Sequence, residues 1–155
     1  MSRLIPKKII QDQIQKNQNK RTSTFEYKGQ MYWLKQKESL SLIKLLLIRN
    51  ASKSLIKEKT VLKKLSKKGI PVPDVIDFGE DYLVLSDVGD AVINIIEKRQ
   101  TYYSNNHPKF HVNGTPSKEK ILTKASRALA KLHKMGYAHG RPSIKDICLK
   151  NNKIY

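Results

Sequence analysis

The stretch Glu58-Lys-Thr-Val-Leu-Lys-Lys-Leu-Ser-Lys-Lys-Gly-Ile-Pro-Val-Pro73 carries the clearest structural signals of the chain. It continues a pattern that begins at Leu55, in which leucines recur at helical spacing among lysines, and this pattern predicts an amphipathic helix over residues 52–68. Gly69 suits the position just past a helix end, and the prolines that follow it require extended backbone. We therefore expect a helix that stops sharply and leads into a strand.

Two β-hairpins are expected on either side of this helix. The predicted strands are Phe25–Tyr27, Met31–Lys37, Val75–Phe78 and Tyr82–Leu85. Lys28-Gly29 provides the turn of the first hairpin. In its second strand, period-two alternation places Met31, Trp33 and Lys35 on one face of the sheet, and Tyr32 with Leu34 on the other.

The remaining segments are less regular. Residues 1–24 are polar and predict an extended N-terminal arm, whereas residues 40–48 are apolar and helical in pattern. A further helix is expected to open at Thr115-Pro116 and to close near Gly136. The other expectations are a helix starting over residues 91–97, a polar loop over 100–115, a loop over 137–150 and a strand over 153–155.

The net charge of +18 is unevenly distributed. Residues 1–70 hold 18 Lys/Arg and 4 acids, residues 71–97 hold 7 acids and no basic residue, and residues 98–155 hold 13 basic residues and 2 acids. Clustered lysines attract nucleic acid or anionic lipid. A solvated basic surface explains the same charge, so both interpretations stay open.

Several classes of function are excluded by composition. The single cysteine, Cys148, rules out an internal disulfide and a zinc cluster of cysteines, which fits a reducing cytoplasm. The start of the chain lacks the apolar core of a signal peptide, and the most apolar stretch is too short to span a bilayer. The sequence contains no Walker loop, no G-x-G-x-x-G phosphate loop and no G-x-S-x-G nucleophile elbow. His107 and His111 are not expected to form a metal site, because no carboxylates flank them.

Lys35 and Glu58 form the first candidate constellation. Glu58 falls on the apolar stripe of the predicted helix, where an unpaired charge is costly, and a lysine on the strand before it is a natural partner. Such a pair holds an ammonium group where it can contact phosphate oxygens. Two unrelated surface charges are the alternative interpretation.

Two further segments are candidates for binding or catalysis. Tyr82-Leu-Val-Leu-Ser-Asp-Val-Gly89 is an apolar strand that leads into a connector, whose backbone groups can meet a flat ligand such as adenine. Taken alone, the segment is better explained as an ordinary strand and turn. Tyr137-Ala-His-Gly-Arg-Pro-Ser-Ile-Lys-Asp-Ile-Cys-Leu149 is a polar loop between ordered elements, a common setting for an active site.

Taken in order, these segments resemble the protein kinase-like superfamily, most closely the small bacterial kinases of the lipopolysaccharide core (Kdo and heptose) type, with RIO kinases as more distant relatives. The resemblance covers residues 25–155 and depends on five segments. They are Tyr32-Trp-Leu-Lys35, Glu58–Pro73, Tyr82–Gly89, Leu129-Ala-Lys-Leu-His133 and His139-Gly-Arg-Pro-Ser-Ile-Lys-Asp-Ile147. It implies an α+β fold: a kinase-like N-lobe (small antiparallel sheet plus helix) over 25–89 and the beginning of a helical C-lobe over 90–155.

The resemblance also implies roles for individual residues. Lys35 is expected to touch the nucleotide phosphates, with Glu58 as its helical partner. Ser86, Asp87 and Val88 are expected to form the hinge that meets adenine. The catalytic residues implied are His139, Arg141 and Asp146, and Asp146 is also the implied Mg²⁺ ligand, so ATP and Mg²⁺ are the expected cofactors.

The sequence departs from the superfamily pattern in three ways. No glycine-rich loop occurs near residues 20–28, and Arg141 stands where the catalytic aspartate of the His-Arg-Asp loop is expected. A His-Gly-Arg-Pro variant followed by Asp-Ile is known within the bacterial branch, so Arg141 does not by itself imply inactivity. The chain also ends at Tyr155, before the Asp-Phe-Gly-like aspartate, so we expect a truncated and weakly active or inactive kinase.

The sequence therefore favours an ATP-dependent phosphotransferase that acts on a hydroxyl of a lipopolysaccharide core sugar or of a protein. Expected partners are a nucleotide and, at the inner face of the membrane, an anionic lipid or a lipid-linked saccharide. The alternatives are a non-catalytic pseudokinase that binds a partner and a basic protein that binds nucleic acid or a membrane surface. Nucleic acid is the weaker of these partners, because neither a recognition helix nor interleaved aromatic residues occur. The acceptor and the oligomeric state are left open.

Overall fold

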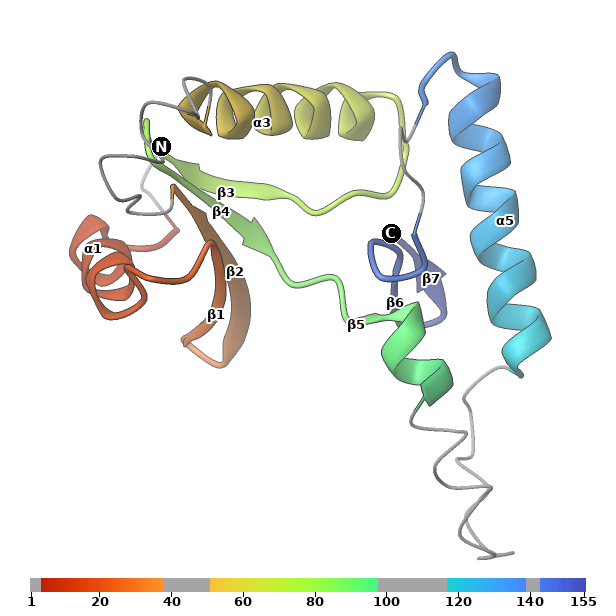
Figure 1. The fold of residues 1–155 in the computed structure, drawn as a ribbon, viewed down its shortest axis with the longest axis horizontal. Helices are drawn as coiled ribbons and strands as arrows, with labels where there is room; N and C mark the ends of the chain where they lie inside the picture. The colour runs from red at the N-terminus through yellow and green to blue at the C-terminus, as the bar shows by residue number, and fades with distance from the viewer. Residues whose placement is uncertain (1–3, 38–50, 98–116, 139–142) are drawn as a thin grey trace, which may run out of the picture. The chain divides into compact units, whose positions relative to one another are not determined.

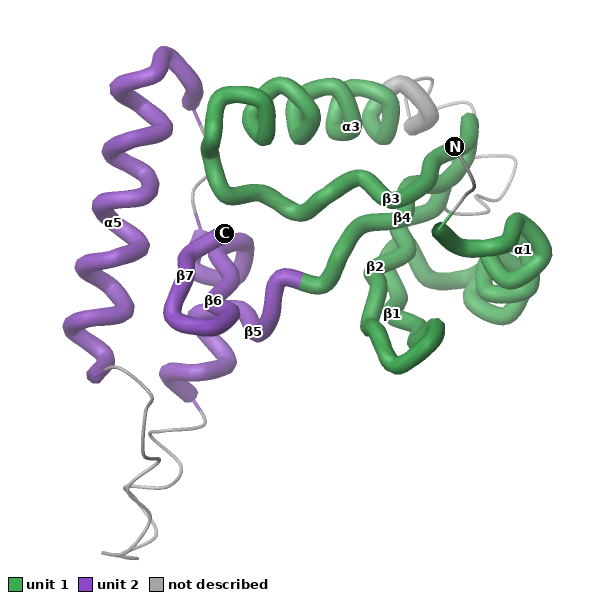
Figure 2. The backbone as a smooth tube through the Cα atoms, turned by 180° about the vertical axis from the view of Figure 1, so that it is seen from behind, with its two compact units in different colours: residues 1–87 green, residues 88–155 purple. Residues whose placement is uncertain are grey.

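The computed structural model of the chain describes residues 4–37, 51–97, 117–138 and 143–155. These residues form two compact units, residues 1–87 and residues 88–155 (Figures 1 and 2). The helix expected over residues 40–48 and the loop expected over 100–115 lie outside the described residues.

The first unit contains a four-stranded antiparallel sheet with the strand order β1-β2-β4-β3. The strands are β1 (Thr22–Tyr27), β2 (Gln30–Gln36), β3 (Val75–Phe78) and β4 (Tyr82–Ser86). Both predicted hairpins are confirmed, and the turn of the first one places Lys28 at φ 51° and Gly29 at φ 72°. The pairing of β2 with β4 joins the two hairpins into one sheet.

The N-terminal segment is not an extended arm throughout, so this expectation is wrong for residues 7–16. These residues form helix α1 (Lys7–Lys16), and Ile10 on it is fully buried, as is Ile5 just before it. Both isoleucines pack with Leu34 and Val84 on one face of the sheet. Burial of a few apolar side chains therefore orders a segment whose composition is mostly polar.

Helix α3 (Ala51–Lys67) packs on the opposite face of the sheet, as the leucine pattern predicts. Leu55 of α3 is buried with Leu83 and Leu85 of β4. The helix ends at Lys67, two residues before Gly69, whose φ is +69°, and the N–H of Ile70 donates to the carbonyl of Leu65. This hydrogen-bonding pattern is a Schellman motif, and it turns the chain toward β3.

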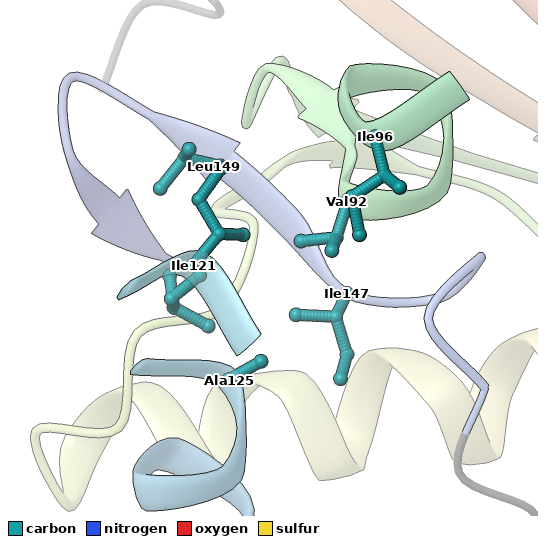
Figure 3. Packing of buried hydrophobic residues seen from close by; sticks show 7 residues of the cluster. Val92, Ile96, Ile121, Ala125, Ile147 and Leu149 are labelled. Atoms are coloured by element: carbon teal, nitrogen blue, oxygen red, sulfur yellow. The ribbon is translucent and has the colours of Figure 1, made fainter. Parts of the chain in front are cut away.

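The second unit packs helix α5 (Lys118–Lys134) with a small antiparallel sheet of order β5-β6-β7. The strands are β5 (Asp90–Ala91), β6 (Cys148–Lys150) and β7 (Lys153–Ile154), and residues 92–97 are helical. The core of the unit consists of Val92, Ile96, Ile121, Ala125, Ile147, Leu149 and Ile154 (Figure 3).

Two local expectations in this unit need correction. The N-cap of α5 is Ser117 and not Thr115, because the Ser117 side chain accepts a hydrogen bond from the Lys120 N–H at 3.3 Å. The expected loop over 137–150 contains β6, whose Leu149 is buried and pairs with Asp90 and with Ile154. The expected helix start near residue 92 and the strand near residue 153 are confirmed.

The expected α+β fold is confirmed. It consists of a kinase-like N-lobe with a small antiparallel sheet and a helix, followed in the sequence by the beginning of a helical C-lobe. Among the helices that the structure describes, none has the length and apolar character needed to cross a bilayer.

Gly89 provides a test of the second unit. Its φ is +86°, and a Cβ atom there would lie 2.3 Å from the Leu149 carbonyl oxygen. We expect Gly89→Ala to lower the free energy of unfolding by about 2–4 kcal/mol, because strain and overpacking add. Gly69→Ala is the matched control: φ is +69° but no atom lies within 4 Å, so a loss of only about 1 kcal/mol is expected. The measurement is urea denaturation of the two variants. Equal losses of the free energy of unfolding would contradict the close approach of residue 89 to the Leu149 carbonyl.

Candidate functional site

Lys35 lies near the end of the central strand β2, on the face that α3 covers. Alternation along β2 determines this placement, because Tyr32 and Leu34 are buried on the α1 face while Trp33 packs with the leucines on the α3 face. Lys35 pairs across the sheet with Leu83 of β4. Its long side chain therefore starts from a fixed position on an inner strand of the sheet, which is paired on both sides.

Glu58 lies one turn after Leu55 on α3 and faces the same side of the helix as Leu62. The Lys35 Nζ lies 2.5 Å from the Glu58 Oε1, an ion pair and hydrogen bond between residues 23 positions apart in sequence. Strand alternation for Lys35 and helical spacing for Glu58 suggest this contact, and the structure contains it.

The ion pair is neither fully buried nor fully exposed. About a third of each side chain remains accessible to solvent, 33% for Lys35 and 31% for Glu58. The carboxylate of Glu58 occupies one donor direction of the ammonium group, and an ammonium has three N–H donors. The arrangement can therefore hold a cation in place and still leave it within reach of an anionic ligand.

The last residue of β4 and the connector that follows it are fixed by two sets of hydrogen bonds. Ser86 donates its backbone N–H to the carbonyl of Asp74, and its hydroxyl accepts from the Asp74 N–H, both at 2.9 Å. The next residue, Asp87, accepts a hydrogen bond from the indole Nε1 of Trp33 at 3.2 Å. Ser86 and Asp87 thus lie in the first unit, attached to β2 and to the segment that precedes β3.

The other predicted residues fall in or around the second unit. Val88 is buried at its start, with 7% of its surface exposed. Asp146 is exposed in a turn, where its backbone N–H donates to the Ser143 carbonyl at 2.9 Å. His139 and Arg141 lie outside the described residues.

Comparison with known proteins shows the family of this chain. A model of the lipopolysaccharide kinase (Kdo/WaaP) family matches residues 9–154. The chain belongs to this family. An uncharacterized protein of Haemophilus influenzae is 32% identical over 145 residues, which make up 94% of this chain and 55% of that protein. The chain therefore spans about half the length of this relative.

The lipopolysaccharide kinase family implies a nucleotide and a divalent metal ion as cofactors, and the described residues offer different groups to each. The Lys35 ammonium is fixed and accessible, which suits phosphate oxygens. For Mg²⁺, Asp146 offers one exposed carboxylate, and within residues 4–37, 51–97, 117–138 and 143–155 no three His, Cys, Asp or Glu side chains gather as a metal site would require.

Trp33 and Asp74 are the residues whose contacts the sequence did not predict. Alternation along β2 places Trp33 on the same face as Lys35, but nothing local indicates that its indole meets a side chain 54 positions away. Asp74 follows Pro73 in the extended connection, and its pairing with Ser86 arises only when β3 and β4 form a hairpin.

The partial exposure of the ion pair predicts a small contribution to stability. We expect a double-mutant cycle with Lys35→Met and Glu58→Gln to give a coupling free energy below about 1 kcal/mol, because water screens the two charges. The measurement is urea denaturation of the four proteins. A coupling above about 3 kcal/mol would contradict this account, since it is typical of a desolvated pair.

Proposed function

We propose that this chain carries the nucleotide-binding part of an ATP-dependent phosphotransferase, with Lys35 on the phosphates and the connector Ser86–Val88 against the adenine. The observation that carries the proposal is the Lys35–Glu58 ion pair, in a chain that matches a kinase family over residues 9–154. An ammonium group in a fixed position offsets the negative charge of the phosphate oxygens. Phosphoryl transfer depends mainly on such positioning and charge neutralisation.

The reaction proposed is transfer of the γ-phosphoryl group of ATP to a hydroxyl. The bond from the γ-phosphorus to the β–γ bridging oxygen breaks, a bond to the hydroxyl oxygen forms, and the hydroxyl proton is released. We propose that His139, Arg141 and Asp146 are the catalytic residues of this reaction. Mg²⁺, with Asp146 as the proposed ligand, would supply further charge neutralisation.

For the acceptor we propose a hydroxyl of a lipid-linked saccharide, with a protein hydroxyl as the second candidate. The family name supports the saccharide, since it describes lipopolysaccharide kinases. The chain spans 55% of the Haemophilus influenzae relative, so the complete reaction is proposed for a protein of that relative's length. The chain is proposed to contribute the nucleotide-binding residues and the residues at positions 139, 141 and 146.

Nucleotide binding is tested by removing the ammonium group. We expect Lys35→Ala to weaken ATP binding at least tenfold, because a hydrogen bond between charged groups is lost. The measurement is calorimetric titration of the chain with ATP in the presence of Mg²⁺. Lys8→Ala is the matched control, because Lys8 is exposed on α1, which packs on the opposite face of the sheet.

Two results would count against the proposal. One is the absence of ATP binding to the unaltered chain at millimolar concentration. The other is equal affinity for ATP in Lys35→Ala and in the unaltered chain, which would show that the ammonium does not contact the nucleotide.

We further propose that the protein works in the cytoplasm at an anionic membrane face, with α3 as the contacting element. The helix has six lysines and one acid, and this acid, Glu58, is paired with Lys35. Phe78, at the end of β3, is 42% exposed, and the ammonium groups of Lys59 and Lys63 of α3 lie 3.8 and 4.9 Å from the centre of its ring. Lysines around an exposed aromatic ring suit an interface of headgroups and acyl chains.

The membrane proposal predicts a loss of vesicle binding when these lysines are neutralised. We expect Lys59→Gln/Lys63→Gln to bind vesicles of phosphatidylglycerol about 30-fold more weakly, since each lysine near the surface contributes about 1 kcal/mol. Lys7→Gln/Lys8→Gln on α1 is the charge-matched control in a sedimentation assay. Equal losses in both double variants would show a response to net charge alone, and stronger binding to single-stranded DNA than to vesicles would favour the nucleic-acid alternative.

A further inference from the structure

The indole of Trp33 links the strand that carries Lys35 to the connector after β4. Trp33 precedes Lys35 by one side-chain repeat on β2, so both side chains project from the same face. Its ring packs beside the buried Leu55, Leu83 and Leu85, and its Nε1 donates to the Oδ1 of Asp87 at 3.2 Å. An indole N–H can only donate and a carboxylate can only accept, so the contact has a fixed direction.

The attachment of Asp87 to Trp33 adds to the attachment of its neighbour. Ser86 is held through its backbone N–H and its hydroxyl, both bonded to Asp74. The last residue of β4, Ser86, and the first residue after it, Asp87, are therefore bonded to different parts of the first unit. The path from Lys35 to Asp87 then runs through one strand and one side-chain contact, which leaves little freedom in the distance between them.

We propose that Trp33 and Asp87 are positioning residues that set the spacing between the phosphate-binding ammonium of Lys35 and the adenine-binding connector. This inference rests on the proposed function, because it takes Lys35 to bind the phosphates. A ligand that spans both places gains affinity when their separation is fixed in advance. A ligand that reaches Lys35 alone gains nothing from the Trp33–Asp87 contact.

The proposal is tested by comparing a spanning ligand with a short one. ATP would span Lys35 and the connector, whereas inorganic triphosphate carries the same phosphate chemistry without the base. In calorimetric titrations, we expect Trp33→Phe to weaken ATP binding about tenfold and to change triphosphate binding by less than twofold, because phenylalanine keeps the ring packing and removes the N–H donor.

Variants of Asp87 give a second, independent measurement that does not alter the core. Asp87→Ala should reproduce the selective loss of ATP affinity, and Asp87→Asn should restore most of it, because the amide oxygen still accepts from the Trp33 indole. Glu26→Ala, which removes an exposed carboxylate from β1, is the matched control and should leave both affinities unchanged.

Each possible result supports or overturns the inference. A selective loss of ATP affinity that is rescued by Asp87→Asn supports it. Equal weakening of ATP and triphosphate, or no change in either, overturns it, because the contact would then be structural only. If the unaltered chain binds triphosphate but gains nothing from the base, the positioning role fails while the role of Lys35 stands. If Lys35→Ala leaves triphosphate binding intact, the proposed function itself fails, and the inference fails with it.

Discussion

The ion pair between Lys35 and Glu58 is the interaction on which the functional account depends. It joins the middle of the sheet to the helix that covers one of its faces, and it leaves the ammonium group about a third exposed. A deeper pair would hold the cation away from any ligand, and a fully exposed one would not fix its position. The partial exposure thus combines a defined location with access, which is what recognition of phosphate oxygens needs.

Alternate side chains of β2 lie on opposite faces of the sheet, and the two faces have different roles. Tyr32 and Leu34 bind α1 through the cluster that includes Ile5 and Ile10, so this face serves stability. Trp33 and Lys35 face α3 and the connector, so the opposite face presents polar groups that the apolar packing holds in place. A one-residue slip of β2 would exchange the two sets and remove both the core contacts and the candidate site.

Strong periodicity made much of the fold predictable from the sequence. The leucine pattern and Gly69 fixed α3 and its end, and the Lys28-Gly29 turn fixed the first hairpin, because each is a local signal. Face assignments suggested the contact between Lys35 and Glu58 but left two unrelated surface charges as the alternative, and the structure contains the contact. Helix α1 was missed because its order depends on a few buried isoleucines in a polar segment. The contact of Trp33 with Asp87 was missed because it depends on the folded sheet, which joins residues far apart in sequence.

The most direct test of the central claim is the chemical reactivity of the Lys35 amine with and without nucleotide. Acylation of individual lysines by an activated ester, followed by mass spectrometry, reports whether a ligand covers each ammonium group, and exposed Lys8 on α1 serves as the internal reference. We expect saturating ATP to slow acylation of Lys35 about tenfold or more and to leave the acylation rate of Lys8 unchanged. Equal acylation of Lys35 with and without ATP would contradict it.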